Sequence, residues 1–518
     1  MKTKQRAMIQ YPRSEKCYVS GRINKIQVGM RRIRLQDTVQ QTAEGKKIVK
    51  PNSPLVVYDT TGAYSDPQFN KDEFDGLPLV REESYGKRKD LCRVEGNGIY
   101  RAKQGKVVTQ LYYAKKRIIT PEMEYVAIRE NQQVETLGLK SYITPEFVRK
   151  EVAAGRAVIP ANINHVELEP MIIGNRFLVK VNSPINYRVG IQEPIAEVKE
   201  QLLSYLAMGC DTLTALFEQE ERSVEETDRL RGALLRNCPI PVGMNPMLAA
   251  AWAGELDWPL FRDRLIVLCE AGVDFVRLYP SLLRAECELL RQRLLRPRSL
   301  EYRIWDSWFL THKGEENFLY VHFDELCEIL GSYDVTLSLG DGMRAVSLYD
   351  SAADSLRQEE LKRVRELVRR AWDHQVQTMV ESAGHAPMDK IQGQMKEIQY
   401  MGHGAPIFTS GPLLTNAACG FDAVGMAIGG AQAAWQGASL LCCSEPEESL
   451  RGAADERRVY YKSLIMAKIA AHAADVAKAH PGAGMRDHAI CKAMAEGNRE
   501  MDVEALSLVP KRFLKLLK

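Results

Sequence analysis

Two neighbouring stretches of this 518-residue chain decide its predicted fold: Leu337-Ser-Leu-Gly-Asp341-Gly342-Met343-Arg344 and Val376-Gln-Thr-Met-Val-Glu381-Ser-Ala-Gly-His385-Ala-Pro-Met388. Each is a short apolar run that ends in charged groups and a glycine, and each precedes a helix-like segment. In a (β/α) barrel the strands bury their apolar bodies, and the loops at their C-terminal ends carry the chemistry. The two stretches therefore predict adjacent strands of a barrel and part of its rim.

Other apolar runs repeat the same strand-then-helix rhythm from about residue 175 to residue 445. The segment from Leu361 to Trp372 has apolar residues at helical spacing and predicts an amphipathic helix with a solvated charged face. About eight such units predict an α/β fold with a closed (β/α)8 barrel of the TIM type. The predicted strands are Arg176–Val181, Thr212–Phe217, Ile240–Met244, Phe275–Leu278, Val335–Leu339, Thr378–Val380, Ile407–Ser410 and Ser439–Cys443, with Tyr302–Trp305 as a ninth candidate.

The rest of the chain divides into an N-terminal and a C-terminal part. Residues 1–150 are rich in turn signals and short β-like runs such as Lys47–Lys50 and Leu55–Tyr58, which predicts an α+β domain. Thr120-Pro-Glu122 and Thr144-Pro-Glu146 both predict helix starts, because Thr caps free N–H groups and Pro fits the first helical position. We predict the barrel at 151–450 and a truncated helical C-terminal segment at 451–518.

Composition limits the classes of function. Lys and Arg number 70 against 67 Asp and Glu, a balance too even to indicate a nucleic-acid partner. Mean hydropathy is -0.27, and neither a membrane-spanning run nor a signal peptide is evident, so we expect a cytoplasmic protein without a membrane partner. The 11 cysteines include no pair at Cys-x-x-Cys spacing, which predicts buried reduced thiols rather than metal ligands.

The polar residues at the two predicted strand ends could carry chemistry. A carboxylate such as Asp341 or Glu381 can fix a hydroxyl or an amine, Arg344 can grip an anion at two points, and His385 can bind a metal. Gly342 allows the backbone to approach a ligand closely. Two later histidines, at positions 472 and 480, are too far apart along a helix for easy shared ligation, so a surface or interface role is predicted for them.

The chain resembles the ThiC family, phosphomethylpyrimidine synthase, over nearly its whole length. The two stretches quoted first belong to the resemblance. The other matching stretches are Val57–Pro67, Thr109–Ala114, Arg117–Asn131, Ile159–His165, Glu169–Gly174, Glu316–Tyr320, Ile469–Asp475 and His480–Asp487. The resemblance implies an N-terminal domain followed by a (β/α)8 barrel, and a dimer.

The resemblance also implies a radical rearrangement that forms the thiamine pyrimidine from aminoimidazole ribonucleotide. The family uses S-adenosylmethionine, a [4Fe–4S] cluster held by a C-terminal Cys-x2-Cys-x4-Cys motif, and zinc. Asp341, Gly342, Arg344 and Glu381 occupy substrate-binding positions of the family, and His385 a metal position. No residue is assigned a catalytic role.

This sequence departs from the family at several decisive positions. It contains no Cys-x2-Cys-x4-Cys motif, and Ser449 stands where the family has its second metal histidine, so His385 should bind a metal weakly. The phosphate-binding segment becomes Ser299-Leu300-Glu301, whose acid should repel a phosphate. The other changed substrate positions are Pro184, Thr214, Leu248, Tyr279 and Phe408.

Three hypotheses follow from this pattern. The favoured one is a ThiC-like paralogue that cannot by itself do radical chemistry and serves as a binding or regulatory subunit, as a homodimer or as a heterodimer with an intact ThiC chain. The second is an enzyme with an altered substrate, in which Asp341, Glu381 and His385 do acid–base work. The third is a residual phosphomethylpyrimidine synthase. The ligand, any partner chain and the pathway stay open at this stage.

Overall fold

The computed structural model describes most of the chain. The described residues are 8–69, 76–86, 88–94, 98–132, 143–186, 194–217, 223–247, 256–292, 300–345, 347–348, 355–382, 384–418, 421–443, 456–496 and 500–509. At its centre lies a closed barrel of parallel strands, which confirms the predicted fold class. The barrel strands are β10 (Lys180–Ile185), β11 (Thr212–Ala215), β12 (Val242–Met244), β13 (Phe275–Leu278), β14 (Thr336–Leu339), β15 (Thr378–Ser382), β16 (Ile407–Thr409) and β17 (Ala438–Cys442).

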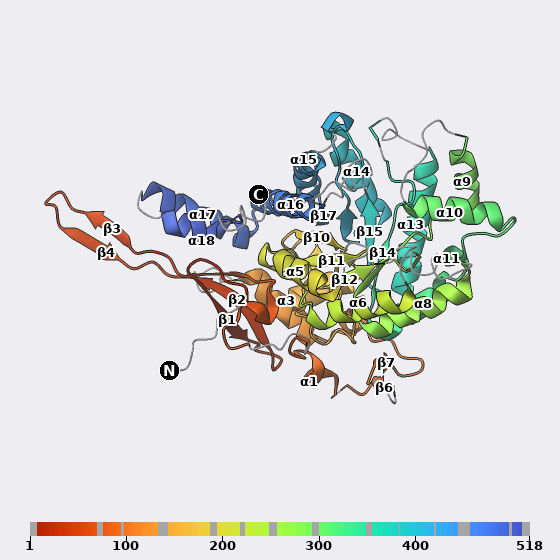
Figure 1. Cartoon of the computed structure of the whole chain (residues 1–518), viewed down its shortest axis with the longest axis horizontal. Helices are drawn as coiled ribbons and strands as arrows, with labels where there is room; N and C mark the ends of the chain where they lie inside the picture. The colour runs from red at the N-terminus through yellow and green to blue at the C-terminus, as the bar shows by residue number, and fades with distance from the viewer. Residues whose placement is uncertain are drawn as a thin grey trace.

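Helices separate the successive strands and surround the barrel (Figure 1). Every residue of the barrel strands is buried, which explains why the strands read as continuous apolar runs rather than as alternating patterns. The barrel helices are α5 (Pro194–Ala207), α6 (Val224–Asn237), α8 (Trp258–Ala271), α9 (Arg284–Leu290), α10 (Leu300–Thr311), α11 (Phe318–Val321), α12 (Phe323–Tyr333), α13 (Ser355–Asp373), α14 (Met388–Met401), α15 (Asp422–Trp435) and α16 (Glu456–Ala477).

Most predicted strands match the observed ones to within two residues at each end, and two differ by more. Tyr302–Trp305 is wrong as a strand, because it belongs to helix α10, where Tyr302, Trp305 and Phe309 bury one helical face. Arg176–Val181 is displaced, because β10 begins only at Lys180, which pairs with Leu440 of β17. The segment before β10 is held instead by side chains, and the Val179 N–H donates to the Asp475 carboxylate at 3.0 Å.

The N-terminal part is an α+β arrangement against one end of the barrel. Strands β1 (Ser14–Ser20), β2 (Gln27–Ile33) and β5 (Leu55–Tyr58) form an antiparallel sheet, and the hairpin of β3 (Thr38–Gln41) and β4 (Lys47–Lys50) projects away from the body (Figure 1). The predicted β4 and β5 ranges are the observed ones. The remaining elements before the barrel are η1 (Gly62–Ser65), α1 (Glu82–Tyr85), β6 (Leu91–Arg93), β7 (Tyr100–Ala102), α2 (Gln110–Lys115), α3 (Pro121–Asn131), α4 (Pro145–Ala153), β8 (Ala157–Val158) and β9 (Ile173–Gly174).

Both predicted threonine caps are present. Thr120 accepts a hydrogen bond from the Met123 N–H at the start of α3, and Thr144 accepts one from the Phe147 N–H at the start of α4. Proline occupies the first turn of each helix, where its missing N–H leaves no intrahelical bond unmade.

The C-terminal helices return to the N-terminal sheet. Helix α17 (Pro481–Ala495) and helix α18 (Glu500–Leu506) follow α16, and the Asp502 carboxylate accepts from the Gln36 N–H at 2.9 Å. Ala505 and Leu506 pack in one apolar cluster with Ile33 and Leu55. The described helices include none that is both long and apolar enough to cross a membrane.

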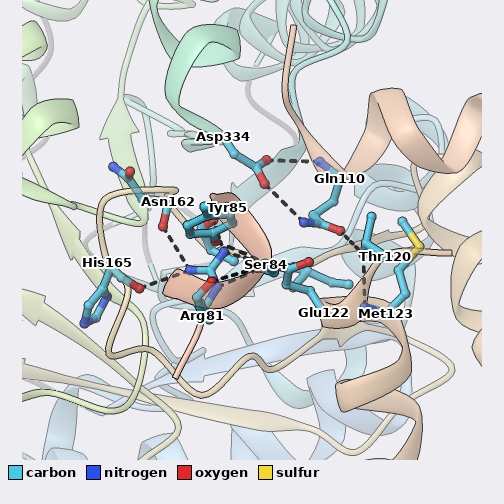
Figure 2. Close-up of polar contacts among 12 residues, drawn as sticks. Arg81, Ser84, Tyr85, Gln110, Thr120, Glu122, Met123, Asn162, His165 and Asp334 are labelled. Atoms are coloured by element: carbon cyan, nitrogen blue, oxygen red, sulfur yellow. Dashed lines mark hydrogen bonds and ion pairs between the residues drawn. The ribbon is translucent and has the colours of Figure 1, made fainter. Parts of the chain in front are cut away.

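A buried polar network joins the N-terminal part to the base of the barrel, the end at which the strands begin (Figure 2). Arg81 donates to the carbonyl groups of Ala161, Asn162 and His165 at 2.9–3.1 Å and pairs with Glu122 at 3.1 Å. Burial alone would raise the pKa of Glu122, but the nearby Arg81 holds it below its ordinary value. Every one of these groups has a partner within the chain, so the network is structural.

Candidate functional site

The candidate site lies at the mouth of the barrel, where the strands end. Asp341 follows β14 and Glu381 lies inside β15, one position before its last residue, rather than just past the strand as predicted. Strand β15 runs two residues further than predicted because Glu381 and Ser382 still pair with Phe408 and Thr409 of β16. The side chain of Glu381 is thus aimed at its barrel neighbours, and it is 3% exposed.

Glu381 is bound on both carboxylate oxygens by groups of the chain itself. Arg277 of β13 donates from Nε to Oε1 at 2.8 Å and from Nη2 to Oε2 at 2.7 Å. Tyr279 adds a hydroxyl donor at 3.2 Å and Ser338 another at 2.8 Å. Burial alone would raise the pKa of Glu381, but Arg277 keeps it below its ordinary value, so the carboxylate is ionised.

Arg277 is a site residue that the sequence reasoning missed. Its guanidinium lies 5.3 Å from the ring centre of Phe408, so the aromatic ring covers the buried ion pair from one side. The signal was available, because Arg277 is the single charged residue in the otherwise apolar segment Phe275–Leu278. A charge inside a buried strand needs a partner, and Glu381 is that partner.

Asp341 differs sharply from Glu381. It is 3% exposed, and neither carboxylate oxygen has a hydrogen-bond donor among the described residues. The nearest cation is Arg357, whose Nη2 lies 3.5 Å from Oδ2. A buried carboxylate with so few donors is costly, and a ligand that donates hydrogen bonds would relieve that cost.

A second residue missed in the sequence, Glu360 of α13, holds the loop that carries Asp341. Its carboxylate accepts from the backbone N–H groups of Gly342 at 2.9 Å and Met343 at 3.0 Å, and from the Ser281 hydroxyl at 3.0 Å. Burial, followed by the charge of Asp341, raises the pKa of Glu360 to about 8. Glu360 is therefore mostly protonated at neutral pH.

The loops carrying Arg344 and His385 lie against each other. The His385 N–H donates to the Ala345 carbonyl at 3.0 Å, and a Cβ on Gly384 would collide with that same carbonyl oxygen. Position 384 therefore requires glycine. Arg344 is half-buried and donates from Nη1 to the Ser410 hydroxyl at 3.2 Å.

Several predicted substrate positions also line the barrel interior. Pro184 and Thr214 are register partners on β10 and β11, and the Thr214 hydroxyl donates to Asn182 at 3.1 Å. Tyr279 and Phe408 are buried beside the Arg277–Glu381 pair. Leu248, Ser299 and Ser449 lie outside the described residues, as do the side chains of Leu300 and Glu301.

The two late histidines serve the C-terminal helices. His472 of α16 bonds Asp487 of α17 at 2.5 Å, and His480 caps α17 by accepting the Gly482 N–H at 3.2 Å. Of the ten described cysteines, eight are buried, Cys92 is half-buried and Cys491 is exposed. Where the structure describes the chain, it brings no three His, Cys, Asp or Glu side chains together in a metal-binding cluster.

Similarity to solved structures is weak. Dihydropteroate synthase from Xanthomonas albilineans is 11% identical, with 55% of this chain and 92% of that chain covered and a TM-score of 0.34. The Stenotrophomonas maltophilia enzyme is also 11% identical, with 60% and 97% covered and a TM-score of 0.34.

Family models match most of the sequence. The model of the ThiC-associated domain matches residues 10–92, and the model of the radical SAM ThiC family matches residues 109–517. Together they cover both the N-terminal sheet and the barrel, as the resemblance implied. The chain therefore belongs to the radical SAM ThiC family and is a protein of the thiamine-pyrimidine synthase type.

Proposed function

We propose that this chain is a ThiC-type barrel that binds a ligand at its mouth but does not by itself carry out the family's radical rearrangement. It acts as a binding or regulatory subunit, either as a homodimer or paired with an intact ThiC chain. A cytoplasmic location remains a prediction.

One observation carries this proposal, namely the closed Arg277–Glu381 pair. Glu381 occupies a position that the family uses for its substrate, yet its oxygens already accept from Arg277, Tyr279 and Ser338. A substrate would have to displace a two-point ion pair to reach that carboxylate. Breaking a buried pair of this kind costs about 3–5 kcal/mol, so Glu381 is poorly suited to holding a ligand directly.

The described residues do not fit the family's metal groups. They contain no cluster of metal-ligating side chains around His385 or elsewhere. Cys238, Cys269 and Cys443 are buried, and burial raises the pKa of each thiol. We therefore derive no step through an iron–sulfur cluster or zinc from these residues.

Ligand binding is expected instead at Asp341 and Arg344. Asp341 supplies a carboxylate with no hydrogen-bond donor among the described groups, and Arg344 supplies a half-buried cation. The buried ring of Tyr279 lies against Gly340, the residue before Asp341. This combination favours a ligand with amine or hydroxyl donors and an aromatic ring over a highly charged nucleotide.

A second candidate function rests on the Asp341–Glu360 pair. Because burial and Asp341 raise the pKa of Glu360 to about 8, the pair can give or take a proton near neutral pH. This favours an enzyme with an altered substrate, in which Asp341 and Glu360 rather than Glu381 do the acid–base work. Substitution Asp341→Asn would abolish turnover in that case, whereas a pure binding subunit has no turnover to lose.

The decisive experiment compares this chain with an intact ThiC protein after anaerobic purification and reconstitution with iron and sulfide. We expect substoichiometric iron and no cleavage of S-adenosylmethionine by this chain alone. One cluster per chain together with cleavage would show a residual synthase and reject the proposal.

Two further measurements address the subunit role. Co-expression with an intact ThiC chain carrying a different tag should yield a mixed dimer, and recovery of separate homodimers alone would argue against the heterodimer. Thermal shift should show stabilisation by neutral aromatic amines or alcohols, and an Asp341→Asn variant should lose it. Stronger stabilisation by aminoimidazole ribonucleotide would contradict the ligand class proposed here.

A further inference from the structure

A polar cavity lies at the base of the barrel, at the opposite end from the mouth. Its volume is about 130 Å³. Its walls come from the N-terminal sheet, from the segment leading into β10 and from helices α16 and α17. The charged groups on its walls include Arg31, Asp59, Lys468 and Arg486.

Most charges around this cavity are already paired within the chain. Each carboxylate on the wall has a cationic partner. The pairs are Asp59 with Lys16 at 3.1 Å, Asp211 with Lys468 at 3.0 Å, Lys180 with Glu130 at 2.8 Å and Asp475 with Lys478 at 3.4 Å. His472 is bound to Asp487, as described above.

Two arginines are the exception. Arg31 of β2 is 8% exposed, with its guanidinium 3.9 Å from the ring centre of Tyr11. Arg486 of α17 donates from Nε to the Leu506 carbonyl at 2.6 Å and from Nη2 to the Ser507 carbonyl at 3.0 Å. Among the described residues no carboxylate lies within 4.0 Å of either guanidinium, although Arg31 interacts with Asp59, and Asp487 with Arg486, at longer range.

The two guanidinium groups are close enough to repel each other. Burial first, and the charge of Arg31 second, lower the pKa of Arg486 to about 9. An anion between them would offset both effects.

We propose that this cavity binds a phosphate group, either as inorganic phosphate or as part of a small phosphate monoester, between Arg31 and Arg486. A phosphate has enough acceptor oxygens to receive donors from two guanidinium forks at once, whereas one carboxylate matches a single fork. The bound group bridges β2 and α17 and so fastens the N-terminal sheet to the C-terminal helices. The site is independent of the function proposed for the mouth.

Isothermal titration of the full chain with inorganic phosphate and with glycerol 3-phosphate tests this site, using sodium chloride and acetate at equal ionic strength as comparison. We expect saturable binding of at least one phosphate probe and none of acetate. Arg31→Gln and Arg486→Gln should each weaken phosphate binding at least tenfold. Arg229→Gln, at an exposed position on α6, is the matched control and should leave binding unchanged.

Because Arg486 also anchors the carbonyl groups at the end of α18, a further variant keeps both arginines. Ala483→Leu fills the cavity from the α17 wall and should abolish phosphate binding while the thermal midpoint without phosphate stays within a few degrees. No saturable phosphate binding by the unmodified chain, unchanged binding by Ala483→Leu, or tighter binding of acetate than of phosphate would each overturn the proposal.

Discussion

Two buried polar side chains at opposite ends of the barrel differ in their partners. At the base, His165 is bonded on both ring nitrogens, to Asp274 at 2.7 Å and to the Cys238 carbonyl at 2.8 Å. At the mouth, Asp341 is equally buried but accepts no hydrogen bond from the described residues. A buried group with all its partners inside the chain stabilises the fold, whereas one without them is suited to a partner from outside.

The mouth itself contains both kinds of group. Glu381 has four donors from its own barrel and resembles the groups at the base, although the family resemblance places it at a substrate position. Asp341 retains the character of a binding residue. The two carboxylates at retained family positions therefore differ. Glu381 now supports the barrel, whereas Asp341 is still available to a ligand.

The largest expected effect tests the structural reading of the base. Arg81→Met removes the partner of Glu122 and the donor to three carbonyl groups, so the unfolding free energy should fall by about 3–5 kcal/mol. Denaturant unfolding measures the loss. The control is Arg370→Met, which removes a surface pair with Asp324 at 3.1 Å and should cost less than about 1 kcal/mol. Equal losses in the two variants would show that the network is not a structural anchor.

The next largest effect tests whether Glu381 now supports the barrel. Glu381→Gln leaves Arg277 without its counter-ion and should destabilise the protein by about 3 kcal/mol, measured by the same method. The double variant Arg277→Met with Glu381→Leu removes both charges and should recover most of that loss. If Glu381→Gln is fully stable but no longer binds a ligand at the mouth, Glu381 is a binding residue rather than a structural one.

A smaller effect concerns pH and the Asp341–Glu360 pair. The pKa of Glu360 is raised from 4.5 in the unfolded chain to about 8 in the fold. Its contribution to stability is therefore fully present below pH 4.5 and is lost as pH rises through 8. Between pH 6 and pH 8.5 the unmodified protein should lose about 2–3 kcal/mol more stability than Glu360→Gln does. Parallel pH profiles for the two proteins, from thermal unfolding, would contradict the raised pKa of Glu360.

The smallest effect compares the two threonine caps. Thr144→Ala should cost about 1 kcal/mol, because only the cap of α4 is lost. Thr120→Ala should cost somewhat more, since the Thr120 hydroxyl is also 2.6 Å from the Gln110 side-chain oxygen, to which it donates. Thermal midpoints of both variants measure the difference. A larger loss at Thr144 would mean that the buried connection between Thr120 and Gln110 adds no stability.

The sequence predicted those parts of the structure that local patterns control. Barrel strands appear as apolar runs of four or five residues, and the predicted range Phe275–Leu278 is the observed β13. Threonine followed by proline marked both helix starts. The error at Tyr302–Trp305 arose where aromatic residues favour strand locally, although their burial at helical spacing in α10 decides otherwise.

The partners of buried groups could not be read from sequence in the same way. Arg277 and Glu381 are separated by 104 residues, and only the pairing of β13 and β15 with opposite sides of β14 brings them close enough for the ion pair. The same holds for Arg31 and Arg486, which come from the N-terminal sheet and the penultimate helix.

The sequence by itself determined the family, the barrel and the identity of the polar residues at its mouth, because periodicity, capping and turn chemistry act over a few residues. Only the tertiary structure decided which of those residues already accept hydrogen bonds from the chain itself. Electrostatic interactions depend on distance and burial, which are set when segments far apart in the chain pack together. Glu381 and Asp341 look alike as carboxylates after neighbouring strands, and the fold makes one of them a supporting group and leaves the other available to a ligand.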